Sequence, residues 1–270
     1  MHHIILKKDI EDTNLLDINK EEYKDDYNHL VNSLRVKVGE DIRVDIESSN
    51  GDKDKAYIGK ISDVNGDSIE IKYVECASFN ELPIYINLYQ GLPKQDKLEF
   101  IVEKATELGV YSIVPVSMKN CIKKMDGSDI KKIDRLKKIA YQASLQSMRH
   151  IIPDIKNPIS FEEMIKDIKS NGSDDKEVYN ILCYEDVSSI DTIDNVIDNI
   201  KSSLQQIKIN NIKDKKIIVN IIIGPEGGFD KQEIEKAKSH NIGLYALGER
   251  ILRTETAPIV ALSQFINIKK

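Results

Sequence analysis

The feature that most limits the fold is an apolar run at residues 217–223 (IIVNIII), followed at once by a glycine-rich segment at residues 224–229 (GPEGGF). The run predicts a strand that is buried on both faces. Asp230 and Glu233 then have the spacing of a capping box that begins a helix. A strand, a glycine loop and a helix N-terminus in succession favour a ligand site, because ligands in open α/β sheets bind beyond the carboxyl ends of the strands.

Strands alternate with helices from residue 83 onward, which predicts a mostly parallel α/β sheet. One helix is expected to begin at Asp96, with Glu99 completing a capping box, and to end at Gly109. A second is expected over residues 129–148. The apolar stripe of the first comprises Leu98, Ile101, Val102, Ala105 and Leu108. Further strands are predicted at 84–89, 111–116, 179–184 and 244–247.

The first 75 residues show a different pattern, with short alternating stretches that predict a small β-barrel or sandwich. Hairpin turns are expected at residues 50–51 and 65–66, both Asn-Gly. The sequence therefore predicts two domains, residues 1–75 and residues 76–270. The polar stretch at 160–215 is expected to hold a surface loop and one or two exposed helices.

Composition excludes several classes of protein. With 40% apolar and 31% charged residues the chain is globular, and no run approaches the roughly eighteen apolar residues that a membrane span needs. The N-terminus lacks the pattern of a signal peptide, so we expect a cytoplasmic protein without membrane contact. The three cysteines are far apart and form no Cys-x-x-Cys pair, so neither disulfides nor a metal site are expected.

Charge gives a mixed indication about nucleic acid. The net charge of −6 argues mildly against such a partner, because phosphate neutralisation normally supplies much of the affinity. However, residues 119–138 hold eight basic residues against three acidic ones. That window is either a phosphate-binding face or an ordinary solvated helix, and charge alone does not separate the two.

The glycine segment 224–229 matches neither common phosphate-binding pattern, since it is neither GxxxxGK[ST] nor GxGxxG. Glu226 in its middle would repel a phosphate but suits a ligand with a positive centre or hydrogen-bond donors. The other interpretation is a tight structural connection without a ligand.

A second polar cluster occupies residues 247–258 (LGERILRTETAP), where a short strand leads through a loop into the last helix. Thr254 or Thr256 can cap that helix, and Pro258 falls in its first turn. Arg250 and Arg253 could be plain surface charges. The density of charged and hydroxyl groups at the end of a strand favours membership of a site.

Together these segments resemble the paired signatures of the 16S ribosomal RNA (uracil-N3) methyltransferase family, within the knotted SPOUT superfamily. Residues 90–99 (QGLPKQDKLE) with 104–110 (KATELGV), and residues 146–149 (QSMR) and 29–35 (HLVNSLR), extend the resemblance over nearly the whole chain. Each signature alone is moderately specific, whereas their order and spacing together are highly specific.

The resemblance implies an N-terminal PUA-like RNA-binding β-barrel, a C-terminal SPOUT α/β domain with a deep trefoil knot, a homodimer, and S-adenosylmethionine as the cofactor. The implied substrate is 16S ribosomal RNA of the small subunit, methylated at uracil N3 in the decoding region. The implied cofactor-binding residues are Leu182, Tyr184, Glu185, Ile223, Gly224, Pro225, Glu226, Gly227, Gly228, Leu247, Gly248, Ile251, Leu252 and Thr254.

By the same resemblance Arg35, Lys94 and Arg149 are expected to contact RNA. Two departures from the family pattern are His3 and Asn120, which stand where arginines are usual. Both positions are expected to lie near RNA rather than near the cofactor.

The uracil N3 proton is weakly acidic, so the enzyme must align N3 with the methyl group and favour the deprotonated base. Arg253 is the catalytic candidate for stabilising negative charge on the uracil carbonyl, and Glu226 is a second candidate, as base or in cofactor orientation. The alternatives are a knotted methyltransferase acting on another RNA position, such as a ribose 2′-hydroxyl, and a non-catalytic RNA-binding assembly factor.

Overall fold

The structure is a computed structural model that describes residues 1–7, 15–47, 55–78, 80–94, 96–122, 129–170, 175–185, 191–210 and 215–269. The chain divides into two compact units, residues 1–81 with 145–151, and residues 82–144 with 152–270. The short segment 145–151 therefore packs with the N-terminal residues although its neighbours in sequence belong to the other unit. The turn predicted at residues 50–51 lies outside the described residues.

The first unit is built on a five-stranded sheet in the order β1-β3-β4-β5-β2. Only β1 and β3 pair in parallel; the other neighbours are antiparallel. The predicted turn at residues 65–66 joins β4 to β5, and the Asn65 side chain accepts hydrogen bonds from the backbone N–H groups of Asp67 and Ser68. The elements are β1 His2–Lys7, β2 Leu15–Asn19, α1 Lys24–Asn28, the π-helical turn η1 His29–Leu34, β3 Asp41–Glu47, β4 Lys55–Val64 and β5 Ser68–Cys76.

The second unit contains an eight-stranded sheet in the order β11-β13-β10-β12-β6-β7-β8, with β9 also pairing with β7. Every pair in it is parallel, which confirms the predicted α/β class. Residues 217–223 of β12 are all buried, as predicted. The strands are β6 Tyr85–Gly91, β7 Ser112–Ser117, β8 Asp154–Ile155, β9 Ile159–Ser160, β10 Lys176–Cys183, β11 Asp191–Thr192, β12 Lys216–Ile223 and β13 Gly243–Ala246.

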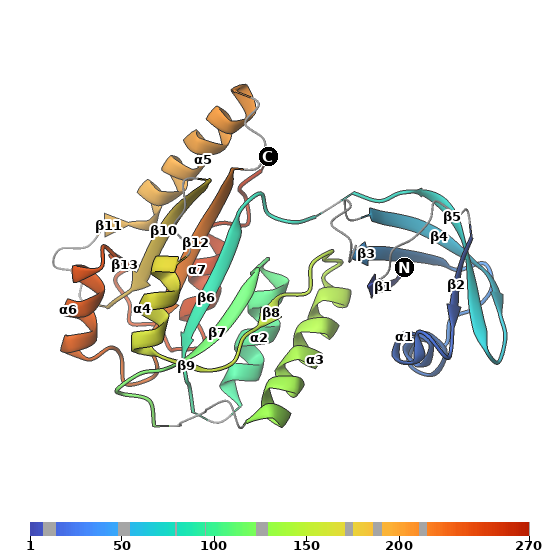
Figure 1. Ribbon diagram of the computed structural model, residues 1–270, viewed down its shortest axis with the longest axis horizontal. Coiled ribbons are helices and arrows are strands. Elements are labelled where there is room, and N and C mark those ends of the chain that lie inside the picture. Colours follow the sequence, from blue (N-terminus) through green and yellow to red (C-terminus); the bar gives the residue numbers. More distant parts are fainter. Residues whose placement is uncertain are drawn as a thin grey trace. The chain divides into compact units, whose positions relative to one another are not determined.

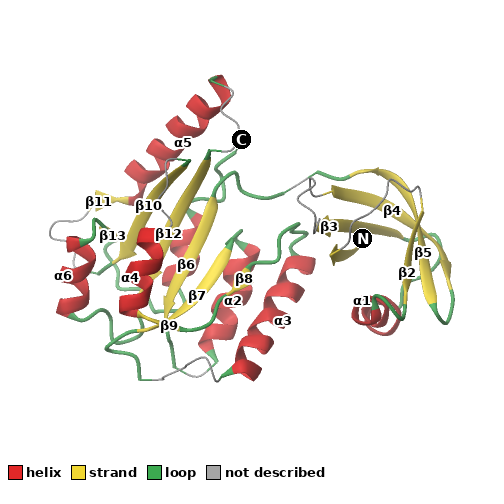
Figure 2. Ribbon diagram, in the orientation of Figure 1, coloured by secondary structure: helices red, strands yellow, loops and turns green. Residues whose placement is uncertain are grey.

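Helices cover both faces of this sheet (Figures 1 and 2). The helices α2 (Lys97–Glu107), α3 (Ile130–Gln146), α5 (Ile193–Ile209) and α7 (Ala257–Ser263) pack on one face, and α4 (Phe161–Ser170) and α6 (Lys231–Ser239) pack on the other. The prediction of one or two helices at 160–215 is confirmed by α4 and α5. They are less exposed than expected, because each buries an apolar face against the sheet. No helix among the described residues is long and apolar enough to cross a membrane.

The predicted signals at the ends of α2 and α6 are formed with one exception. The Asp230–Glu233 capping box is formed in full, and Gly109, at φ +89°, ends α2 with the paired hydrogen bonds of a Schellman motif. Asp96 is the residue before α2, yet its side chain makes no capping bond. Its backbone is not extended, and the carboxylate of Glu99 pairs with Arg135 at 2.7 Å instead.

A ladder of polar side chains crosses four neighbouring strands inside the sheet. Asn220 donates to Asn180 at 2.8 Å, Asn87 donates to Asn220 at 2.9 Å, and the Ser112 hydroxyl donates to Asn87 at 2.7 Å. These four residues are direct register partners on β10, β12, β6 and β7. Since a one-residue slip would leave buried amides unpaired, the ladder fixes the register of the strands.

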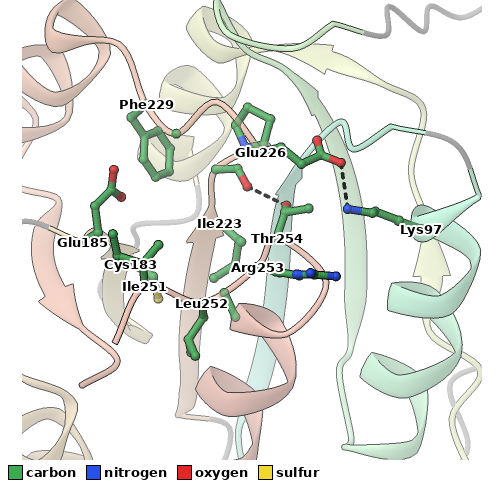
Figure 3. Close-up of a pocket in the computed structure, with 14 residues that line it drawn as sticks. Lys97, Cys183, Glu185, Ile223, Glu226, Phe229, Ile251, Leu252, Arg253 and Thr254 are labelled. Carbon is green, nitrogen blue, oxygen red and sulfur yellow. Dashed lines mark hydrogen bonds and ion pairs between the residues drawn. The ribbon is translucent and has the colours of Figure 1, made fainter. Parts of the chain in front are cut away.

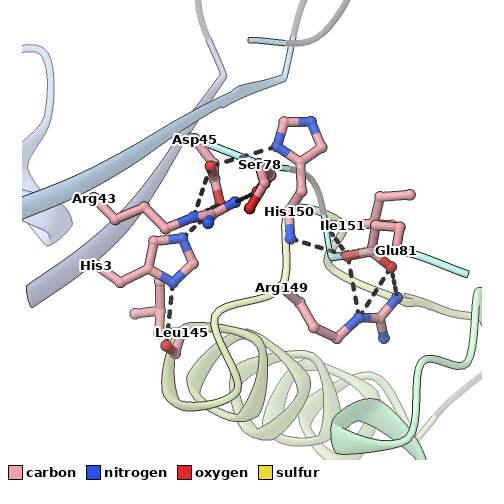
Figure 4. Close-up of polar contacts among 9 residues, drawn as sticks. All are labelled: His3, Arg43, Asp45, Ser78, Glu81, Leu145, Arg149, His150 and Ile151. Atoms are coloured by element: carbon pink, nitrogen blue, oxygen red, sulfur yellow. Dashed lines mark hydrogen bonds and ion pairs between the residues drawn. The ribbon is translucent and has the colours of Figure 1, made fainter. Parts of the chain in front are cut away.

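A buried charge cluster joins the segment 145–151 to the strands of the first unit (Figure 4). Asp45 is fully buried and accepts hydrogen bonds from His3 at 2.7 Å and from Arg43 at 3.0 Å, while His150 lies 3.6 Å from its other oxygen. His3 also donates to the carbonyl oxygen of Leu145 at 3.1 Å. Burial raises the pKa of Asp45, but these hydrogen bonds outweigh it and hold that pKa well below its usual value.

Candidate functional site

The carboxyl ends of β6, β10, β12 and β13 meet at one edge of the parallel sheet, and a cavity opens there. It has a volume of about 360 Å³ (Figure 3). A neighbouring cavity of about 70 Å³ shares several of its lining residues. The larger cavity is lined by Lys97, Cys183, Glu185, Ile223, Gly224, Pro225, Glu226, Gly228, Phe229, Ile251, Leu252, Arg253, Thr254 and Ala257.

Most of the residues expected at a cofactor site lie at these two cavities. The larger one contains nine of the fourteen, together with the catalytic candidate Arg253. The smaller one adds Tyr184, Leu247 and Gly248. Residues 183–185, 223–229 and 247–257 are far apart in the sequence, but the fold brings them together. Their meeting point is where the family resemblance implies a bound cofactor.

Two expected residues, Leu182 and Gly227, line neither cavity. Leu182 is fully buried among the residues that pack against α4 and α6, whereas its neighbour Cys183 faces the other side and reaches the cavity. The difference follows from the alternation of side chains along a strand. The sequence reasoning also missed Lys97, Phe229 and Ala257, although Lys97 lies inside the segment 90–99 that carried part of the resemblance.

The glycines of segment 224–229 serve the packing of the protein itself. A Cβ atom on Gly224 would lie 3.1 Å from the Phe229 ring, and one on Gly227 would lie 2.9 Å from the Cβ of Asn120. Gly228 has a φ of +66°, a conformation that other residues rarely adopt. Any larger side chain would therefore change the path of the loop along the cavity.

Glu226 is held in place by several groups. Its carboxylate accepts a hydrogen bond from the backbone N–H of Lys94 at 3.0 Å and lies 3.2 Å from the ammonium of Lys97. Partial burial raises the pKa of Glu226, but these two interactions outweigh it, so the pKa lies below the usual glutamate value. Glu226 is therefore an anion and a weak base, which suits the orientation of a positively charged ligand better than proton abstraction.

Thr254 joins three of the converging segments. Its hydroxyl donates to the carbonyl oxygen of Gly224 at 2.8 Å and accepts a hydrogen bond from the Gln90 side chain at 3.1 Å. Thr254 and Gln90 are both buried. The expected cap of α7 is not formed by either threonine, because Thr254 bonds to Gly224 and Thr256, although directly before the helix, makes no side-chain cap bond.

Arg253 presents a cation at the cavity. Its side chain is exposed and makes no hydrogen bond or ion pair with any residue that the structure describes. A guanidinium without a protein partner is available to bind negative charge on a ligand or substrate. The expected catalytic position of Arg253 is thus compatible with its surroundings.

Two residues of the segment that follows β7, Lys119 and Asn120, contact the glycine loop and the start of α6. Asn120 donates hydrogen bonds to the carbonyl oxygens of Gly227 at 3.0 Å and Gly228 at 3.2 Å. Lys119 donates its backbone N–H to Glu233 at 2.9 Å, and its ammonium lies 3.0 Å from Asp230, both at the start of α6. Asn120 therefore supports the loop of the cavity itself, which differs from the expectation that it lies near RNA and away from the cofactor.

The residues expected to contact RNA differ in exposure. Arg35 and Lys94 are exposed, and Arg35 has a left-handed backbone with φ +51° at the end of η1. Arg149 is only 4% exposed and pairs with Glu81 at 2.7 Å, so in this structure it anchors the segment 145–151 and is not presented to a ligand (Figure 4). His3 is likewise buried at Asp45 and does not lie on a surface.

Among the residues that the structure describes, no group of three or more His, Cys, Asp or Glu side chains could hold a metal ion. The cavity instead combines apolar walls, carboxylates and a free guanidinium. Fold and site together define an α/β protein that binds a small organic ligand beyond the carboxyl ends of its strands.

Residues 80–266 match the family model described as the RNA methyltransferase domain, and the chain belongs to this RNA methyltransferase family. A relative in Bacillus subtilis (strain 168), ribosomal RNA small subunit methyltransferase E, is 33% identical over 96% of this chain and 92% of its own length. A putative methyltransferase from Legionella pneumophila, solved with bound S-adenosylmethionine, is 26% identical with a TM-score of 0.70 over 97% of this chain and 96% of its own. The Neisseria gonorrhoeae ribosomal RNA small subunit methyltransferase E is 24% identical and has the same fold. Its TM-score is 0.72 over 98% of this chain and 96% of its own.

Proposed function

We propose that this protein transfers a methyl group from S-adenosylmethionine to N3 of a specific uridine in 16S ribosomal RNA of the small subunit. The observation that carries the proposal is the cavity at the sheet edge. There the anchored carboxylate of Glu226 and the guanidinium of Arg253, which is unpaired among the described residues, lie on converging loops. The similarity to ribosomal RNA small subunit methyltransferase E over nearly the full chain supports the substrate.

The cavity fits S-adenosylmethionine in size and in chemistry. A volume of about 360 Å³ lies within the range of small-ligand sites. Ile223, Leu252 and Ile251 provide apolar surface for an adenine ring, and Ile251 is 83% exposed until something covers it. The carboxylates of Glu185 and Glu226 match the positive amino and sulfonium groups and the ribose hydroxyls, and no lysine clamp for a phosphate is needed.

When bound, S-adenosylmethionine supplies an electrophilic methyl group, and the residues of the chain prepare the base that receives it. Loss of the N3 proton of uracil places negative charge on the neighbouring carbonyl oxygens. The free guanidinium of Arg253 can hydrogen-bond to such an oxygen and stabilise that charge. Glu226, whose carboxylate is fixed by the backbone N–H of Lys94 and by the ammonium of Lys97, would orient the cofactor's positive groups, and its lowered pKa makes it a weak acceptor for the N3 proton.

We assign the remaining parts by the same family resemblance. The first unit, with its five-stranded sheet and the exposed Arg35, is proposed as the PUA-like RNA-binding domain. The parallel sheet and its helices are proposed as a SPOUT domain whose chain forms a deep trefoil knot, in a homodimer. N3 lies on the pairing edge of uracil, so the target must be unpaired or flipped out. A ribosomal substrate also favours a cytoplasmic location.

The test is transfer of labelled methyl from S-adenosylmethionine to small ribosomal subunits taken from a strain that lacks this modification. The RNA is then digested to nucleosides, and the labelled nucleoside is identified. Labelled 3-methyluridine supports the proposal. Label in a 2′-O-methyl nucleoside would indicate a knotted methyltransferase of another specificity, and cofactor binding without any label would indicate an RNA-binding assembly factor.

A further inference from the structure

Lys97, the first residue of α2, lies between two carboxylates from different loops. Its Nζ atom is 3.2 Å from Glu226 and 3.0 Å from Glu255. Figure 3 shows the Lys97 side chain directed toward Glu226, with their ion pair drawn as a dashed line. Neither the glycine loop pattern nor the polar cluster at residues 247–258 indicates this lysine.

The two partners belong to the two segments that form the site. Glu226 is in the middle of the glycine loop after β12, and Glu255 follows Arg253 and Thr254 directly. One ammonium therefore connects α2, the glycine loop and the turn that carries the catalytic candidate. The hydroxyl of Thr254 joins the same loop and turn through Gly224, so the two segments are held at two points.

The three side chains of this ion-pair network are less exposed than those of an ordinary surface ion pair. The side chains of Glu226 and Glu255 are 23% and 18% exposed, and that of Lys97 is 31% exposed. The carboxylates of Glu255 and Glu226, which both pair with the ammonium, raise the pKa of Lys97, so this side chain stays protonated. Without it two partly buried carboxylates would lie near each other with no shared cation between them.

A second lysine on the same helix provides a natural comparison. Lys104 is 32% exposed and also pairs with two carboxylates, those of Glu103 at 2.7 Å and Glu107 at 2.8 Å. Both of those partners lie on α2 itself, so Lys104 connects no separate segments. The two lysines are thus matched in their own exposure and in their number of partners. They differ in that the partners of Lys104 are more exposed, at 47% and 31%, and belong to a single helix.

We propose that Lys97 is a positioning residue for the methyl transfer, which holds the loop of Glu226 and the turn of Arg253 at one fixed spacing across the cavity. This inference rests on the proposed function. Small displacements of groups that position a reacting base reduce turnover strongly, by up to about 100-fold for a shift on the order of 1 Å.

The experiment compares Lys97→Met, Lys97→Arg and the control Lys104→Met in the full-length protein. For each we would measure kcat, the KM for S-adenosylmethionine, its Kd by titration calorimetry, and the melting temperature. We expect Lys97→Met to lower kcat by about 10-fold or more and to weaken cofactor binding several-fold, because the spacing is lost. Lys97→Arg should recover a large part of the activity, and Lys104→Met should retain the wild-type values.

A second substitution tests whether the lower kcat of Lys97→Met comes from the unbalanced charge of the two carboxylates or from loss of folding. In Lys97→Met with Glu255→Gln, only one carboxylate remains, so kcat should rise above that of Lys97→Met alone. The proposal is overturned if Lys97→Met keeps kcat and Kd within about twofold of wild type, or if Lys104→Met lowers them equally. Wild-type protein that binds the cofactor but methylates no RNA would refute the proposed function, while the Kd series would still decide whether Lys97 holds the loops.

Discussion

The hydroxyl of Thr254 donates a 2.8 Å hydrogen bond to the carbonyl oxygen of Gly224, thirty residues earlier in the chain. Because the same hydroxyl accepts from Gln90 at 3.1 Å, a single side chain connects the end of β6, the start of the glycine loop and the turn before α7. Two of these segments, the glycine loop and the turn, line the cavity, and Gln90 connects them to β6 of the sheet. The hydroxyl therefore couples the shape of the cavity to the core of the sheet.

Replacing Thr254 by valine keeps the volume but removes the hydroxyl. The amide of Gln90 and the carbonyl of Gly224 would then lose a partner, and leaving a buried polar group unpaired costs about 1–3 kcal/mol. We expect a lower free energy of unfolding and roughly tenfold weaker binding of S-adenosylmethionine. Thr254→Ser is the control, since it keeps the hydroxyl, and equal binding by both variants would refute the coupling.

Arg253→Ala should reduce turnover far more than cofactor binding. The guanidinium makes no hydrogen bond or ion pair among the described residues, so its removal breaks no such contact of the cavity walls. Loss of one group that stabilises developing negative charge lowers kcat by about 100- to 1000-fold. Single-turnover methylation of small subunits measures the rate constant of methyl transfer, steady-state turnover measures kcat, and calorimetry measures the Kd. Unchanged turnover would remove Arg253 from the mechanism, and Arg253→Lys should retain part of the rate.

The asparagine ladder predicts graded effects on stability. Asn220→Val removes the acceptor of the Asn87 amide and the donor to Asn180, while Asn87 keeps its bond from Ser112, so it should lower the free energy of unfolding by about 2 kcal/mol or more. Asn180→Val, at the end of the ladder, leaves only the donor of Asn220 unpaired and should cost less. Urea unfolding of the two variants tests the order. If Asn180→Val were the more harmful, the ladder would not control the register as described.

Stability should depend on pH through Asp45. The folded-state pKa of Asp45 lies below its ordinary value of 3.8, so near and below that value the unfolded chain binds more protons than the folded one. The contribution of Asp45 is thus complete above pH 3.8 and is lost as the pH falls toward the folded-state pKa. Asp45→Asn should cost about 3 kcal/mol near neutral pH, since it breaks a buried charge cluster.

Denaturant unfolding of wild type and Asp45→Asn at about pH 7 and at about pH 3 gives the measurement. The difference between the two proteins should be smaller at the lower pH. A difference that stays constant, or grows on acidification, would contradict the assigned direction of the shift.

The sequence predicted the part of the site that depends on local pattern. The buried strand β12, the glycine segment and the capping box at Asp230 follow from consecutive residues, and all three are present. At Asp96 the same local rule failed, because Arg135, 36 positions from Glu99, takes the carboxylate that the capping box requires. The competing partner comes from another helix, which a local pattern does not contain.

Contacts between residues that are far apart in the sequence could not be predicted from local sequence patterns. Leu182 and Cys183 are adjacent, yet only Cys183 reaches the cavity, because the register of β10 decides which of them faces it. Lys97 gains its position from carboxylates 129 and 158 residues later in the chain, at Glu226 and Glu255. Arg149 has a side chain of the type that often binds nucleic acid, but in this structure it is buried in the first unit and pairs with Glu81.

The return of residues 145–151 to the first unit determines when that unit can be completed during synthesis. A nascent chain that has reached residue 81 already contains Asp45 and Glu81, but the backbone of Leu145 and the side chains of Arg149 and His150 have not yet been made. The charge cluster of the N-terminal strands can therefore form only after α3 and the residues that follow it have been synthesised. A gene fragment cut at the apparent boundary would encode an unfinished domain, and transplantation of that domain would require the helix and its return segment as well.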